Sequence, residues 1–257
     1  MDNFFSRSYR KEGPGVSKSA TQKKRFFLFF ELFFRKFGSN IGVSLLFLLC
    51  CLPVVTFGPA CCGLALVLRN FVREEHAFVI HDFFRGFKEN FKQGLLVGLL
   101  NLAAFGLTGF ACYFYFIEMS DQTIMMVFFA ICTLCLIIEL FMTFYAYTMI
   151  VTFTLPTKKL IKNAFLLSLI GIRSNVITLF WMVFLLFLGF FLFTVFPALV
   201  LLIPVILLPM ALYIIAFNSY PHIQKHLIDP YVEKQKSEQT DEPDGEEGTI
   251  FTDDVQS

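Results

Sequence analysis

The chain has 257 residues, of which 56% are hydrophobic and 16% charged, and its formal net charge is +1. A soluble domain averages about 45–50% apolar and about 25% charged residues, so this composition excludes an ordinary soluble domain. The apolar residues are concentrated in blocks at 41–57, 94–117, 124–155 and 176–217, and Glu139 is the one charged residue within them.

Uncharged apolar runs of this length are typical of membrane spans. About 20 helical residues cross a hydrocarbon core of about 30 Å. We therefore predict an all-α fold, a polytopic helical membrane protein with about six transmembrane segments and cytoplasmic amphipathic helices. Five segments plus a re-entrant hairpin is the alternative. The lipid bilayer is the first partner that this composition predicts.

The two ends of the chain differ in charge and divide it into three parts. Residues 1–21 are polar and basic, and 229–257 are acidic, so both are predicted to be disordered around a single membrane domain at 22–228. Basic residues between positions 7 and 36 are typical of a cytoplasmic flank, and we do not expect them to bind nucleic acid. The first span follows this long basic lead, which does not resemble a cleavable signal.

The membrane domain begins with an amphipathic segment and two short apolar segments. Residues 22–37 combine a charged face with many phenylalanines, which fits a helix in the headgroup plane or a cap packed on the bundle. Spans are predicted near 41–57 and 59–72. Hydrophobic length alone leaves open whether these two segments cross the bilayer twice or form a re-entrant hairpin.

The turn between these two segments contains four residues that we single out as structural. Pro53 removes a helical hydrogen bond, and Thr56 can bond the freed carbonyl groups. Gly58 permits unusual backbone angles, and Pro59 suits the first turn of a new helix. Broken helices also line substrate sites in transporters, which is the competing interpretation of this turn.

The rest of the domain contains one more amphipathic segment and four further spans. Residues 78–93 alternate phenylalanines with charges at helical spacing, which predicts a second interfacial helix. Spans follow near 94–117, 124–155, 176–196 and 198–217, with a tight turn near Pro197.

Charge in the connecting loops predicts the topology. The loop at 118–123 has no lysine or arginine, whereas the loop at 156–175 has Lys158, Lys159, Lys162 and Arg173. Cytoplasmic loops carry the excess of basic residues, so both termini are predicted to be cytoplasmic. The segment 41–72 must then leave the cytoplasmic side and return to it.

Three blocks of sequence resemble the YesL-like family of bacterial integral membrane proteins. They are LPVVTFGPA at 52–60, DFFRGFKENFKQ at 82–93 and, more weakly, LIKNA at 160–164. The resemblance implies a multi-pass protein of a bacterial plasma membrane that belongs to a domain-of-unknown-function family. Members often accompany genes for saccharide uptake, which implies saccharide ABC transporter or sensor subunits as partners. The family supplies no catalytic or ligand residues.

Glu139 is the strongest candidate for a functional residue, since a carboxylate in the middle of a span is costly and is by default a functional-site hypothesis. It could act in proton or ion transfer or contact a substrate. Alternatively, it is protonated and bonded to a neighbouring helix, for instance through Tyr145 or Asn101.

No other pattern predicts chemistry. Cys132 and Cys135 share a helix face, and His222 and His226 stand four residues apart, but neither pair has the further ligands that a metal needs. We therefore predict no metal, cofactor or catalytic residue, and no enzyme. The function predicted is accessory to carbohydrate uptake or its regulation. The alternative is a small transporter or channel that uses Glu139 and the proline-broken helices.

Overall fold

A computed structural model describes residues 25–118, 123–196, 198 and 202–233. Within these ranges every regular element is helical, which confirms the predicted all-α class. The elements are α2 (Arg25–Arg35), α3 (Phe37–Cys50), η1 (Val54–Thr56), α4 (Phe57–Val72), α5 (Val79–Glu89), α6 (Phe91–Glu118), α7 (Thr123–Ile150), α8 (Thr157–Ile170), α9 (Ile172–Val195), α10 (Leu202–Ile223) and the π-helical turn η3 (Gln224–Ile228).

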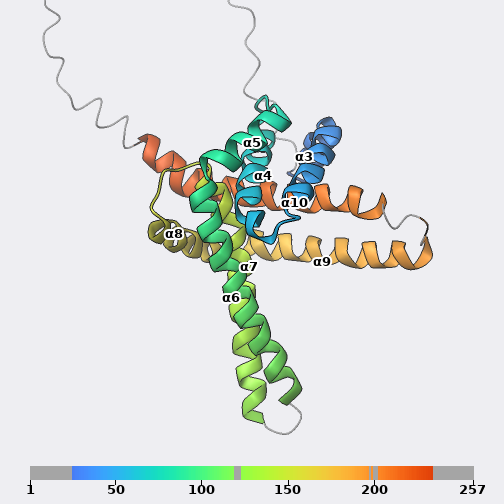
Figure 1. Cartoon of the computed structure of the whole chain (residues 1–257), viewed down its shortest axis with the longest axis vertical. Coiled ribbons are helices and arrows are strands. Elements are labelled where there is room, and N and C mark those ends of the chain that lie inside the picture. The colour runs from blue at the N-terminus through green and yellow to red at the C-terminus, as the bar shows by residue number, and fades with distance from the viewer. Residues whose placement is uncertain (1–24, 119–122, 197, 199–201, 234–257) are drawn as a thin grey trace, which may run out of the picture.

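Helix α4 lies at the centre of a packed body, from which two long hairpins project (Figure 1). Helices α3, α5, α6, α7 and α10 all pack against α4, and most of its residues are buried. The α6–α7 hairpin and the α9–α10 hairpin leave this body in different directions. The chain therefore combines a core of protein contacts with two arms that have little protein around them.

Several of these helices are suited to crossing a membrane. Five are long and apolar enough, and a sixth span is possible if α2 and α3, which meet at a bend of 75°, form one broken span or a re-entrant element. Alone, α3 rises only about 21 Å, which is short for a bilayer. The chain is thus a multi-pass helical membrane protein.

The predicted turn is built from a short 3-10 segment. Helix α3 ends at Cys50, η1 follows Pro53, and α4 begins at Phe57, two residues before Pro59. Pro59 still lies in the first turn of α4, where backbone N–H groups have no intrahelical partner. The Thr56 hydroxyl donates to the carbonyl groups of Cys50 and Pro53, which returns a hydrogen bond to the broken end of α3.

The two amphipathic helices both pack on protein. In α2, Phe29, Leu32 and Phe33 are buried, and Phe29 meets Tyr213 and Phe217 of α10. In α5, Phe83 is fully buried against α4. Other phenylalanines of α2, such as Phe27, remain exposed, so this helix has both a packed face and an apolar outer face.

Some boundaries differ from the sequence-based expectation. Helix α7 ends at Ile150 rather than near Leu155, and a helix that we did not anticipate, α8, occupies the basic loop. Residues 229–233, predicted as tail, are helical. The predicted disordered segment 1–21, most of the acidic tail and the turn at Pro197 lie outside the described residues.

Candidate functional site

The turn residue Gly58 lies at a very close contact between α4 and α6. A Cβ atom on Gly58 would overlap the Gly94 carbonyl group, and one on Gly98 would come within 2.7 Å of the Gly58 Cα atom. Small residues allow helix backbones to approach closely in membranes, where packing takes the place of the hydrophobic effect. Gly58 is therefore required for the helix crossing itself.

Helix α5 reaches α4 through a second pair of glycines. A Cβ atom on Gly63 would lie 2.6 Å from the Phe83 carbonyl oxygen, and one on Gly86 would lie 3.0 Å from that of Cys62. The two blocks of sequence at 52–60 and 82–93 thus lead into a single junction of α4, α5 and α6. The described contacts give both blocks an architectural role, which is to let these three helices pack closely.

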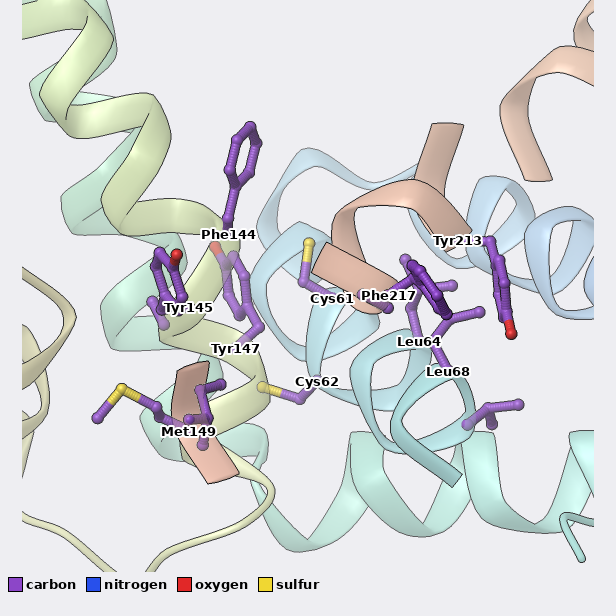
Figure 2. Close-up of a cluster of buried hydrophobic side chains, with 14 of the residues drawn as sticks. Cys61, Cys62, Leu64, Leu68, Phe144, Tyr145, Tyr147, Met149, Tyr213 and Phe217 are labelled. Carbon is purple, nitrogen blue, oxygen red and sulfur yellow. The ribbon is translucent and has the colours of Figure 1, made fainter. Parts of the chain in front are cut away.

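The core around this junction continues towards α7 and α10. Figure 2 shows Cys61 and Cys62 on the side of α4 towards Tyr147 of α7, and Leu64 and Leu68 on the side towards α10. Each of the seven cysteines is a free thiol. Among the described residues no group of three or more His, Cys, Asp and Glu side chains could hold a metal ion.

Charged side chains join the elements at one end of the body. Arg69 Nη1 donates to the Val151 carbonyl oxygen at 2.8 Å, just beyond the end of α7. Arg35 pairs with Glu74 at 2.7 Å, and Lys36 Nζ donates to the Glu75 carbonyl oxygen at 2.9 Å. The bases Arg35, Lys36 and Arg69 thus gather at the ends of α2 and α4, next to the end of α7.

Glu139 lies in a cavity of about 520 Å³ between α6, α7 and α8. Its Oε1 atom is buried and has no hydrogen-bond partner among the described residues. Burying a carboxyl oxygen without a partner is unfavourable, so this atom is a ready acceptor for a ligand, a proton or a water molecule.

Neither of the two predicted partners bonds to Glu139. Asn101 shares the cavity, but its amide donates to Thr143 Oγ1 at 3.4 Å. The Tyr145 hydroxyl donates to Asn175 Oδ1 at 2.7 Å, on α9. Among the described residues no second acid and no Lys, Arg or His lines the cavity, so the lining provides a single carboxyl group and not a chain of acids and bases.

Hydrogen bonds of polar side chains that the sequence analysis did not single out connect α9 to α7, α8 and α10. Besides accepting from Tyr145, Asn175 donates from Nδ2 to the Ser168 carbonyl oxygen at 2.9 Å. Asn218 of α10 donates to Thr178 Oγ1 of α9 at 2.9 Å. The signal in the sequence is the presence of two amides, Asn175 and Asn218, at the ends of an otherwise apolar run.

The sequence analysis also considered two pairs of possible metal ligands, His222 with His226 and Cys132 with Cys135. The rings of His222 and His226 stack with their centroids 6.4 Å apart on the last turns of α10 and η3. Cys132 and Cys135 lie on α7, where it pairs with α6.

Comparison with known proteins gives one match. A family model described as "Protein of unknown function, DUF624" matches residues 41–114, from α3 to near the end of α6. The matched segment contains the whole glycine junction and ends before Glu139. Comparisons with curated proteins and with solved structures find no match.

Proposed function

We propose that the chain is a non-enzymatic membrane protein, accessory to carbohydrate uptake or its regulation. It acts through lateral contacts between its projecting hairpins and the membrane-embedded subunits of a saccharide transporter or sensor. The site of this activity is the outer surface of the α6–α7 and α9–α10 hairpins. In this proposal the protein lies in a bacterial plasma membrane with both termini in the cytoplasm.

The observation that carries this proposal is the small fraction of hairpin residues that the described part of the chain buries. In the most apolar windows of α6 and α7 only 11% and 6% of residues are buried, and for α9 and the span that contains α10 the values are 11% and 33%. For the central helix α4 the value is 67%. A transporter encloses its path with several spans, whereas these hairpins diverge and leave their apolar faces to lipid or to other membrane helices.

The saccharide system is suggested by the resemblance to the YesL-like family. The two most specific blocks of that resemblance lie within the segment that matches the domain of unknown function. Members of the YesL-like family accompany genes for saccharide uptake, so membrane subunits of such transporters are the partners we propose.

Photo-crosslinking from defined positions tests this proposal. We place a photoreactive residue at Phe110 in α6 or at Phe190 in α9, both strongly exposed, and at Ile80 in α5 as an exposed control on the body. We expect hairpin positions to crosslink to saccharide-transporter membrane subunits and Ile80 not to do so. Crosslinks to lipid alone at both hairpin positions would contradict the proposal.

The second candidate is a small transporter or channel that uses Glu139. It is supported by the unpartnered Oε1 atom and by the cavity around it. Flux into proteoliposomes separates the two functions, with Glu139→Gln as the test and Glu118→Gln, at the exposed hairpin end, as the matched control. Flux that only Glu139→Gln abolishes supports the transporter, and absence of flux in the native protein supports the accessory function.

A further inference from the structure

A second cavity, of about 480 Å³, lies between α2 and the α9–α10 hairpin. It is separate from the Glu139 cavity and shares no lining residue with it. Most of its wall is aromatic or aliphatic, and four residues with polar side chains complete it. The lining consists of Phe26, Phe29, Phe30, Ile177, Trp181, Met210, Ile214 and Phe217, together with Arg173, Ser174, Asn218 and His222.

The polar residues are gathered at one end of this cavity. Helices α9 and α10 are antiparallel, since Ser174 Oγ donates to the Asn218 carbonyl oxygen at 3.2 Å and Gly189, further along α9, lies beside Leu207, nearer the start of α10. Arg173 and His222 belong to the same end, near the start of α9 and the end of α10. Trp181 lies eight residues after Arg173, about 12 Å further along the helix axis. The cavity is therefore amphipathic along its length, with a basic end and an apolar end.

The charge of Arg173 is not balanced among the described residues. Arg173 makes no ion pair or hydrogen bond with another described side chain, and no acid lines the cavity. Arg173 also lies in the first turn of α9, where the helix dipole favours an anion. An anionic group is thus the expected complement.

We propose that this cavity binds one acyl chain of an anionic phospholipid, with the phosphate on the Arg173 guanidinium. Arginine binds phosphate in a bidentate manner, and the apolar wall takes the chain towards Trp181. Access is from the bilayer, because the lining residues Phe26 and Ile177 are more than half exposed. In the sequence, Arg173 comes after the lysines of α8. Basic segments of this kind are attracted to the anionic lipids of the cytoplasmic leaflet. This inference does not depend on the proposed function.

Trp181 is the only tryptophan of the chain, so its fluorescence reports on this cavity. The full-length protein is placed in nanodiscs of unlabelled phosphatidylcholine. A small, equal fraction of mid-chain brominated phosphatidylglycerol or brominated phosphatidylcholine is added as quencher. We expect an apparent affinity about tenfold or more higher for the anionic lipid, because a hydrogen bond to a charged group is gained.

Two variants and one control complete the test. Arg173→Gln should bring the ratio between the two lipids close to one, and Ile177→Phe, which narrows the cavity, should weaken quenching by both. Lys162→Gln, at an exposed base of α8, should keep the native ratio. Equal quenching by both lipids in the native protein overturns the proposal without any variant. So does an unchanged ratio in Arg173→Gln, or stronger quenching by a brominated free fatty acid than by brominated phosphatidylglycerol.

Discussion

The two halves of α6 have the same kind of sequence and opposite surroundings. In the first half, Gly94 and Gly98 are in contact with the backbone of α4. In the second half, Cβ atoms on Gly106 and Gly109 would have no neighbour within 4 Å. Figure 1 shows that this half pairs only with α7 as the hairpin leaves the body.

The difference shows that one helix can serve two structural purposes. Its first half is held by close backbone packing, which fixes where α4, α5 and α6 cross. Its second half has no such constraint, and its apolar side chains face lipid or another protein. The body should therefore respond to small changes in side-chain volume, and the hairpin should tolerate them.

The largest effect is expected for Gly58→Ala. The added methyl group overlaps the backbone of α6, which cannot move as a flexible side chain could. Overpacking commonly costs about 1–3 kcal/mol, and we expect this substitution to reach or exceed the upper end. Thermal unfolding and size-exclusion profiles in detergent measure the loss.

Gly106→Ala is the matched control for this substitution. It adds the same methyl group within an α-helix and meets nothing, so it should leave stability unchanged or raise it by about 0.5–1 kcal/mol. Similar losses for the two variants would show that the halves of α6 are not different in packing.

Asn175→Leu extends the comparison to the second hairpin, with an expected cost of about 1–3 kcal/mol. The Tyr145 hydroxyl and the Ser168 carbonyl group would lose their partner in a buried site. Trp181 fluorescence during thermal unfolding follows α9 directly. Adding Tyr145→Phe should recover part of the loss, because both members of one bond are then removed; no recovery would mean that the two side chains are not coupled.

The sequence predicted the class of the fold because long uncharged runs leave few alternatives to membrane helices. It also drew attention to Glu139 by its charge, and a functional role for this residue stays a prediction. It singled out Gly58 as a turn residue, but it could not distinguish Gly94 and Gly98 from Gly106 and Gly109, because the sequence around a glycine in an apolar run does not indicate which helix lies beside it. For the same reason it named Asn101 and Tyr145 as partners of Glu139, although helix rotation directs both to other acceptors.

Asn40→Leu should stabilise the body. The Asn40 side chain is fully buried in α3, and neither its oxygen nor its nitrogen has a partner among the described residues. An unsatisfied buried amide costs about 1–3 kcal/mol, and leucine has the same branching and the same number of side-chain heavy atoms, so the thermal midpoint should rise. Asn218→Leu, in which the amide has a partner at 2.9 Å, should lower it. A fall in both variants would show that Asn40 is hydrogen-bonded.

The smallest effect is expected at the rim of the body, where α4 ends. Glu74 has a left-handed backbone with φ of 59°, and the N–H groups of Glu74 and Glu75 bond the carbonyl oxygens of Phe71 and Asn70. This is the Schellman ending that glycine normally occupies. The Arg35–Glu74 pair is half exposed and, like most surface ion pairs, contributes little to stability.

Glu74→Ala and Glu74→Gly both remove this ion pair, but only glycine relieves the left-handed backbone. We therefore expect the glycine variant to be about 1 kcal/mol more stable than the alanine variant, in thermal unfolding of the two proteins side by side. The glycine variant should then be close to the native protein, because the lost pair and the relieved backbone offset each other. A more stable alanine variant would show that residue 74 does not have a left-handed backbone at the end of α4.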